Sequence, residues 1–522
     1  MRNLRLLGIS LLLASPLMFF LVHQYIAHSP ELIPTGFIQD DDVVYMANAR
    51  QHLEGKPALT YSNPFSYSTA SPAIYSQPYN FLLCFLLSFY WAFPGLILTI
   101  FGMVSAIFCI YFSLKLVEYL YPDLKQKGIV YLLLVWGGGV TALAGLIANQ
   151  TFLKGTYPDF WDGIYMVDPG YGWWGMNFGR VLFISTEAYY HLLFIAGIFL
   201  IVRHRWMPAL IISFLLSWSH PFTGVEYLLI VCGWLCIEKF FFRNRSIPWW
   251  ILYSFFFLLL LHIYYYLIFL NQFPEHKKLY EVFAVDWGYS FRVYLPAYLL
   301  VILLALCTFY KQKISGVFRL EHQRLFFSWA IIAFLLSNHE WFIKPIQPIH
   351  FARGYVWLGL FLFSVPGLNR ILERLRNQKI ALGLFILLFL ADNILWYVNK
   401  WRMRAEHEGV AYITKDTQQI LGWLHRNTTT NDLLISNEYM ASYMANAYAS
   451  SYSWTGHLYN TPDFDVKKNQ ALEFFRSGVP LPNWKGRRLL ILIRKSKTDV
   501  PVTENLKRKK LFENDTYEVF VN

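Results

Sequence analysis

The sequence predicts a mainly α-helical protein that crosses a membrane about eleven times and ends in a small α/β domain. Of its 522 residues, 56% are hydrophobic, 19% are aromatic and only 15% are charged, whereas a soluble domain averages about 25% charged residues. Apolar runs near the ~20 residues that cross a bilayer recur as far as residue 400, and the rest of the chain is polar. We therefore expect a membrane domain over 1–400, with an outer loop at 27–78, and a separate domain over 401–522.

The excess of basic residues indicates how the protein is oriented in the membrane, and not that it binds nucleic acid. The net charge is +12, the pI is about 9.2 and the mean hydropathy is +0.35. Many lysines and arginines stand in short loops between apolar runs, where the positive-inside rule explains them. A basic membrane face also favours anionic phospholipid or polyprenyl-phosphate head groups. All five cysteines fall in apolar runs, so we expect neither a disulfide framework nor a cysteine-bound metal.

The first apolar run, Leu4 to Ile26, follows Arg2 and Arg5, which places the N-terminus in the cytoplasm. No small-residue cleavage site follows it, so we expect a retained first span. The segment 81–120 is broken by Pro94 and is either two spans or one span preceded by a helix that dips into the membrane. If only 95–120 crosses, the basic loops that follow all fall on the cytoplasmic side, and we expect this arrangement.

The remaining spans follow from the length rule. They are expected at about 129–148, 180–202, 207–219, 222–241, 248–270, 291–310, 324–338, 354–369 and 380–399. An odd number of spans places the polar tail, from about residue 405, outside the cytoplasm. The tail has a helix signal at 415–426, a second helix after Thr461 as N-cap with Pro462 at the first position, and strand-like runs at 433–435, 489–493 and 517–521. Alternating helices and strands predict an α/β domain.

Three adjacent carboxylates, Asp40, Asp41 and Asp42, stand in the outer loop just past the first span. Adjacent acids raise one another's pKa unless a cation or hydrogen-bond donors hold them. One interpretation is a solvated loop that caps a helix, which needs only one aspartate. The interpretation we favour is a catalytic or metal-binding cluster at the membrane face. A helix along the interface is expected next, over 43–53, closed by Gly55.

Other ionisable residues lie within spans or in the outer loops, and each has a structural alternative. Glu187 and His191, spaced i, i+4 on one helix face, either pair with each other or act on a substrate. His220 either ends a helix or belongs to the site, and Arg180 is a further candidate for phosphate binding. Asp159, Asp162 and Asp168, among tryptophans, are either solvated acids of an interfacial belt or part of the site.

A late outer loop carries Lys344, His350 and Arg353. An arginine just before a span suits bidentate binding of a phosphate, although these cations alternatively meet only lipid phosphate. Together the outer residues predict chemistry in which a carboxylate accepts the proton of an acceptor hydroxyl. Basic groups, and a divalent cation if one is bound, stabilise a departing phosphate. We expect the acids and the cations to share one cavity on the outer face.

Five motifs then point to a family. They are Gly36-Phe37-Ile38-Gln39-Asp40-Asp41-Asp42-Val43-Val44-Tyr45, Leu53-Glu54-Gly55, Gln77-Pro78-Tyr79, Pro348-Ile349-His350-Phe351-Ala352-Arg353 and Gly456-His457-Leu458-Tyr459-Asn460-Thr461-Pro462-Asp463. With the layout of spans, they resemble the GT-C class of membrane glycosyltransferases. The resemblance is to the bacterial polyprenyl-phosphate-sugar-dependent group, which includes lipid A aminoarabinose transferases and dolichyl-phosphate-mannose-type mannosyltransferases.

The resemblance implies an inverting transferase with Asp41 as the catalytic base, or Asp40 or Asp42 by a shift of one residue. It implies Tyr45, His457 and Asp463 as further substrate-binding residues. The chain departs from the family in its aspartate triplet, where many members have Asp-Glu. It also lacks a clear Asp-x-Asp in the second outer loop. Asp159 and Asp162 are the nearest substitutes as ligands of a Mg²⁺ or Mn²⁺ ion.

The expected partners are the lipid bilayer, a polyprenyl-phosphate-linked sugar donor and a lipid, glycan or protein acceptor, but no nucleic acid. The expected location is a bacterial inner membrane with the tail domain extracytoplasmic. Two alternatives stay open. One is a polysaccharide polymerase or ligase that uses a polyprenyl-diphosphate-linked glycan. The other is a lipid-linked-sugar transporter or flippase, which predicts polar residues at mid-bilayer and inverted repeats.

Overall fold

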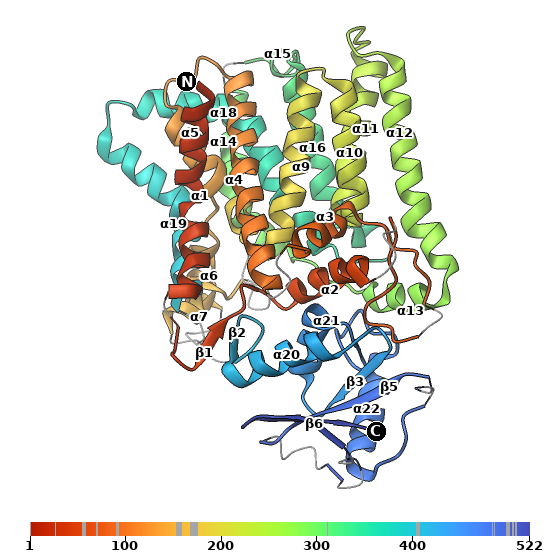
Figure 1. The fold of residues 1–522 in the computed structure, drawn as a ribbon. Helices are drawn as coiled ribbons and strands as arrows, with labels where there is room; N and C mark the ends of the chain where they lie inside the picture. The colour runs from red at the N-terminus through yellow and green to blue at the C-terminus, as the bar shows by residue number, and fades with distance from the viewer. Residues whose placement is uncertain are drawn as a thin grey trace. The chain divides into compact units, whose positions relative to one another are not determined.

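The computed structural model describes most of the chain, and the greater part of it is helical (Figure 1). The described residues are 2–26, 28–54, 59–68, 71–89, 93–152, 159–167, 176–310, 312–402, 408–482, 484, 486–496, 502–503, 506 and 509–522. Gly55 and Asp168, both named in the sequence expectations, lie outside them.

The chain up to about residue 400 is built almost wholly of helices, as its composition predicts. They are α1 (Arg2–Ile26), α2 (Asp41–Glu54), α3 (Pro78–Leu87), α4 (Pro94–Leu120), α5 (Lys127–Trp136), α6 (Thr141–Thr151), α7 (Phe160–Ile164), α8 (Phe178–Val181), α9 (Ser185–Val202), α10 (Trp206–Ser219), α11 (Pro221–Cys236), η2 (Ile237–Phe241), α12 (Trp249–Ile263), η3 (Tyr264–Phe269), η4 (Leu270–Gln272), α13 (Pro274–Phe283), α14 (Phe291–Thr308), α15 (Ile314–Val317), α16 (Glu321–Leu336), η5 (His339–Trp341), α17 (Ile349–Ala352), α18 (Tyr355–Leu375) and α19 (Lys379–Arg402).

Each of the expected spans is helical, although 129–148 and 180–202 each cover two helices, and the count of eleven is not confirmed. By length and composition, seven helices of the described residues qualify as membrane spans, or eight if the bent pair α5 and α6 forms one span. The other three expected spans, α10, α11 and α16, have only 14, 16 and 16 residues. Helix α3 has 10 residues; at 1.5 Å per residue it is too short to cross a core of about 30 Å. Its length agrees with the arrangement in which only 95–120 crosses.

The described chain divides into two compact units, and the division does not follow the linear one. The bundle unit comprises Met1–Met18, Gly102–Tyr264 and Ala284–Arg404. The tail unit comprises Phe19–Phe101, Tyr265–Phe283 and Ala405–Asn522. The first outer loop therefore belongs with the C-terminal domain rather than with the membrane helices that follow it.

Small residues bring the helices of the bundle unit close together. Helix α18 packs against both α14 and α16, and these helices run side by side in Figure 1. A Cβ on Gly367 would meet the backbone of Leu304, and one on Gly359 would meet the backbone of Ala330. In a membrane, lipid is as apolar as the side chains, so helices associate through such close backbone packing.

At the break between α5 and α6, side chains of the bundle unit form hydrogen bonds with backbone groups that the helices leave unpaired. The two helices meet at 51°. Asp392 of α19 accepts hydrogen bonds from the backbone N–H groups of Thr141 (2.7 Å) and Ala142 (2.9 Å), while Asn393 donates to the carbonyl of Trp136 at 2.5 Å. A broken helix is tolerated in a membrane when neighbouring side chains pair its free groups. Arg180 donates to Asn393 at 2.5 Å and so belongs to this arrangement.

The C-terminal part of the tail unit is the α/β domain that the sequence predicts. Its elements are β2 (Tyr412–Thr414), α20 (Lys415–Asn427), β3 (Asp432–Ser436), α21 (Tyr439–Tyr448), β4 (Tyr452–Ser453), α22 (Phe464–Ser477), β5 (Arg488–Arg494), β6 (Lys509–Glu513) and β7 (Tyr517–Val521). One sheet has the order β4-β3-β5-β7-β6, parallel from β4 to β5 and antiparallel from β5 to β6. Strand β1 (Leu32–Pro34) of the outer loop pairs with β2.

One helix start differs from the expectation. Helix α22 begins at Phe464 with Asp463 as its N-cap residue, in the left-handed conformation at φ 55°. The prediction of Thr461 as N-cap is wrong, because the Thr461 hydroxyl accepts a hydrogen bond from the backbone N–H of Gly456 at 3.2 Å. The hydroxyl thus closes the preceding turn instead of capping the helix.

The predicted orientation is tested by cysteine labelling in a variant without the native cysteines. We expect Leu59→Cys and Asn431→Cys, both exposed, to react with a membrane-impermeant maleimide added outside the cell. Ile314→Cys, exposed on a basic loop, should react only after permeabilisation. The reverse pattern would contradict the orientation.

Candidate functional site

Two polar centres contain eight of the candidate residues, one centre in each unit. The loop centre, in the tail unit, consists of Asp40, Asp41, Tyr443, His457 and Asn460. The bundle centre, in the bundle unit, consists of Glu187, His191, His220, His350 and Arg353. All residues of each centre belong to one unit.

The loop centre joins the first outer loop to the Gly-His motif of the tail. Asp41 is the first residue of α2, and its Oδ1 lies 3.2 Å from Nε2 of His457. Nδ1 of His457 accepts a hydrogen bond from the backbone N–H of Tyr459 (3.3 Å) and lies 2.7 Å from the amide nitrogen of Asn460. Because Nδ1 accepts, the ring proton of neutral His457 is on Nε2, which donates it to Asp41. The tail thus orients the carboxylate of the outer loop.

Aromatic side chains enclose this pair. The Tyr443 hydroxyl donates to the backbone carbonyl of Asp40, and the Tyr443 ring lies 5.6 Å from the ring of His457. Phe65 of the outer loop packs on both rings. A Cβ on Gly456 would meet the Phe65 ring, which explains a glycine at that position. Burial, and then the charge of Asp41, raise the pKa of Asp40, while His457 lowers it.

Asp42 has a structural position, unlike its two neighbours. Its side chain is buried, and Oδ2 accepts hydrogen bonds from the backbone N–H groups of Ile38 (2.8 Å) and Gln39 (3.3 Å). Burial raises the pKa of Asp42 to about 7, against the lowering effect of these two bonds. Asp42 therefore shapes the turn that presents Asp40 and Asp41, and a catalytic role for it remains a prediction.

Tyr45 and Asp463 also lie in the tail unit. The Tyr45 ring meets the ring of Tyr79 edge-on at 5.7 Å, so it joins α2 to α3. Asp463 forms an ion pair with Lys278 of α13, at 2.9 Å and 3.0 Å from its two oxygens. Their expected contact with substrate remains a prediction.

The bundle centre is built around Arg353, just before α18. Its guanidinium forms an ion pair with Glu187, whose side chain is 1% exposed. His191, one turn after Glu187, places Nε2 at 2.8 Å from the carbonyl of Arg353 and Nδ1 at 2.8 Å from the carbonyl of Glu187. The expected i, i+4 pair therefore exists, with 3.8 Å between Nδ1 and the carboxylate, and it also holds Arg353.

Two further histidines face Arg353. Nε2 of His350 lies 3.3 Å from its guanidinium, and the His350 ring stacks on Phe222 at 4.4 Å. His220 is the N-cap of α11: its Nδ1 accepts a hydrogen bond from the backbone N–H of Thr223 at 3.2 Å. Its ring centroid is 5.9 Å from that of His350. The structure therefore gathers one arginine and two imidazoles, which suits an anion.

Glu226 is a buried acid that the sequence analysis missed. It lies on α11 and is fully buried, and neither carboxylate oxygen has a hydrogen-bond partner among the described residues. The signal was available, because an ionisable residue inside a membrane span is a functional candidate by default. Asp392 and the buried ion pair of Glu238 with Arg324 were missed in the same way.

The remaining candidates do not join either centre. Lys344 is exposed, and Arg180 contacts Asn393 as described above. Asp159 caps α7 by accepting from the backbone N–H of Trp161 at 2.7 Å and lies 4.0 Å from Arg402. Asp162 is exposed. Among the described residues, no group of three or more His, Cys, Asp or Glu could hold a metal ion. A divalent cation thus remains a prediction, and the mechanism below uses none.

The stability of the turn at Asp42 should depend on pH. A carboxyl whose pKa is raised from about 3.9 to about 7 on folding binds its proton more tightly in the folded state. Its contribution to stability is complete below about pH 4 and is lost as the pH rises through about 7. We expect the melting temperature to fall less between about pH 5 and about pH 8 in Asp42→Asn than in the wild type. An equal fall would contradict the assignment, and Asp465→Asn, at an exposed acid of α22, is the control.

No protein-family model matches the chain, and no curated protein matches it. Solved structures of oligosaccharyltransferase from Archaeoglobus fulgidus are similar, one of them described as AglB. The form with an inhibitory peptide and a dolichol-phosphate is 12% identical with a TM-score of 0.43, covering 94% of this chain and 69% of that one. The form with zinc and sulfate is 11% identical with a TM-score of 0.43, covering 99% and 72%. These matches concern the fold alone.

Proposed function

We propose that this protein is an integral membrane glycosyltransferase. It transfers a sugar from a polyprenyl-phosphate donor to an acceptor hydroxyl on the extracytoplasmic face. The observation that supports the proposal most is the hydrogen bond from His457 to Asp41, which aims a carboxylate from the first outer loop. The resemblance of that loop to GT-C enzymes points in the same direction.

Asp41 is suited to act as a general base. Its side chain is 62% exposed, so the carboxylate meets solvent while one oxygen is held by His457. In the proposed step, the acceptor hydroxyl gives its proton to Asp41 as its oxygen attacks the anomeric carbon of the sugar. The bond from that carbon to the phosphate oxygen breaks, and polyprenyl phosphate leaves with the bonding electron pair. General base catalysis of this kind contributes about 10²–10⁴-fold in rate.

The bundle centre is suited to hold the phosphate. A guanidinium presents paired N–H groups that match phosphate oxygens. Since Nδ1 of His220 accepts from Thr223, the proton of its neutral ring is on Nε2 and is available to an anion. Glu187 and His191 orient Arg353 through its side chain and its backbone carbonyl. These groups would stabilise the negative charge of a phosphate bound to Arg353.

The acceptor, the identity of the sugar and the cellular membrane remain predictions. A lipid, glycan or protein acceptor and a bacterial inner membrane are the expectations that we carry forward. A polymerase or ligase would require a polyprenyl-diphosphate donor, and a transporter would release no polyprenyl phosphate. The choice of donor in the assay therefore separates these alternatives.

The role of Asp41 is tested with purified protein and a radiolabelled polyprenyl-phosphate sugar. We expect Asp41→Asn to lower the release of polyprenyl phosphate by about 10²-fold or more. His457→Ala should lower kcat by about tenfold with little change in the donor KM, because it removes the group that orients the base. Asp465→Asn, an exposed carboxylate of the same unit, is the matched control and should act like the wild type. Unchanged release by Asp41→Asn would refute the site.

The role of Arg353 is tested by Arg353→Lys, which keeps the charge but removes the planar fork. We expect kcat/KM for the donor to fall by about 10²-fold, as when one stabilising donor is removed elsewhere. Inhibition by added polyprenyl phosphate should weaken in parallel. Arg292→Lys, at an exposed arginine of α14, serves as the comparison. Full activity in Arg353→Lys together with undiminished inhibition would exclude Arg353 from phosphate binding.

A further inference from the structure

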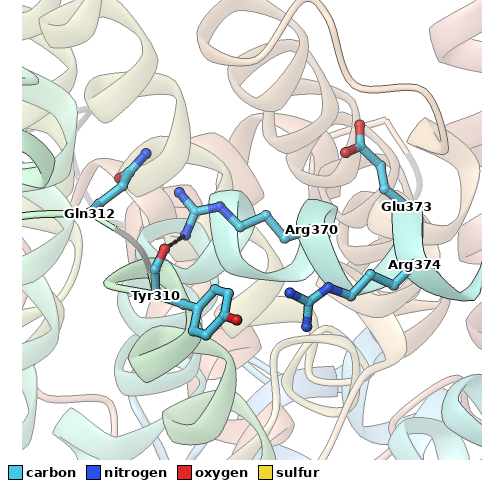
Figure 2. A pocket seen from close by; sticks show the side chains of 5 residues that line it. All are labelled: Tyr310, Gln312, Arg370, Glu373 and Arg374. Atoms are coloured by element: carbon cyan, nitrogen blue, oxygen red, sulfur yellow. Dashed lines mark hydrogen bonds between the residues drawn. The ribbon is translucent and has the colours of Figure 1, made fainter.

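A pocket lies near the C-terminal ends of α14 and α18. None of the residues that line it belongs to either polar centre. Its volume is about 490 Å³, and it is lined by Tyr310, Gln312, Arg370, Glu373 and Arg374 (Figure 2). Two guanidinium groups thus line one hollow in the bundle unit. The proposed transfer reaction makes no use of them.

Arg370 is fixed at the wall of this pocket by the end of α14. Its Nη1 lies within hydrogen-bond distance of three backbone carbonyls, those of Cys307 (3.0 Å), Thr308 (3.0 Å) and Tyr310 (2.9 Å). Cys307 and Thr308 are the last two residues of α14, and the Cys307 carbonyl also accepts a hydrogen bond from the backbone N–H of Tyr310 at 3.2 Å. Figure 2 shows the bond to Tyr310 and the guanidinium held beside it. One nitrogen of the guanidinium closes the helix, which leaves the group anchored with a positive charge at the pocket.

Arg374 lies one turn further along α18. The centre of its guanidinium is 5.1 Å from the centroid of the Tyr310 ring, a cation–π contact. The acid of the pocket, Glu373, already has partners: Lys125 lies 3.9 Å away, and the side-chain amide of Asn369 donates to it at 3.4 Å. The pocket therefore has two positive charges against one negative charge. This balance favours the binding of an anion with several acceptor oxygens.

The position of the pocket indicates a lipid. Helix α14 belongs to the candidate span Phe291–Thr308, and α18 to the candidate span Ile349–Leu375. Tyr310 follows the first span by two residues, and both arginines stand in the last two turns of the second. Aromatic and basic residues at span ends lie at the head-group level. The exposed Lys313 and Arg319 precede α16 in the same loop, and the positive-inside rule places this basic loop in the cytoplasm.

We propose that this pocket binds the phosphate of an anionic glycerophospholipid in the cytoplasmic leaflet. The guanidinium groups of Arg370 and Arg374 hold the phosphate, and the acyl chains follow the apolar faces of the two spans. Anionic lipids are enriched in the cytoplasmic leaflet, where they attract basic groups next to membrane spans. The site is independent of the proposed glycosyl transfer, because its residues belong to neither centre.

The test uses the full-length protein purified in a neutral detergent. Phosphatidylglycerol, phosphatidylcholine and inorganic phosphate are titrated separately, and binding is followed by native mass spectrometry. We expect phosphatidylglycerol to bind more tightly than either of the others. Arg374→Gln should weaken that binding by about tenfold or more, as expected for the loss of a charged hydrogen bond. Arg376→Gln, an exposed arginine two positions later, should leave it unchanged.

The outcomes separate the possible origins of binding. Equal binding of phosphatidylcholine and phosphatidylglycerol would overturn the proposal, because the arginines would then not select charge. If inorganic phosphate bound as tightly as phosphatidylglycerol, the pocket would be a site for a free anion and not for a lipid. Equal losses of phosphatidylglycerol binding in Arg374→Gln and Arg376→Gln would overturn the proposal, because binding would then depend on overall positive charge and not on this pocket. Arg370→Gln is the second variant, and Arg374→Gln keeps the test decisive if loss of the α14 contacts prevents folding.

Discussion

The hydrogen bond between Asp41 and His457 is the interaction on which the functional account rests. It joins residues that are 416 positions apart in the sequence. The outer loop is held in place for it by the pairing of β1 with β2 and by the packing of α2 against α21. The backbone N–H of Tyr459 sets the tautomer of the ring, so the direction of the bond is fixed as well. An outer loop without the tail would still hold Asp42 through its own backbone, but it would lose the hydrogen bond that orients Asp41.

The bundle unit follows a single rule, that a charge or a free backbone group within the membrane needs a partner. Arg353 with Glu187, Arg324 with Glu238, and Asp392 with the start of α6 each satisfy it. Glu226 departs from the rule within the described part of the chain, since neither of its oxygens accepts a hydrogen bond there. It lies on α11, whose N-cap residue is His220 of the bundle centre.

The architecture could be predicted from the sequence because apolar length determines where membrane helices form. The strands β3 and β5 contain uninterrupted apolar runs, and β7 is apolar apart from Glu518, so these strands were found for the same reason. Helix α21 was missed because it is buried on most faces and lacks a polar stripe, and β6 because it is a charged edge strand. The candidate residues could be named, but not their pairing. Asp41 with His457 is a long-range contact, and only the fold distinguishes the structural Asp42 from its exposed neighbours.

The account makes Asp41 a base that activates the acceptor directly, without a covalent sugar intermediate on the enzyme. A single displacement of this kind inverts the configuration at the anomeric carbon, whereas a double displacement retains it. The most direct measurement is therefore the anomeric configuration of the product, determined by NMR against a donor of known configuration. The account predicts inversion. Retention would contradict it, because the sugar would then pass through a nucleophile on the protein.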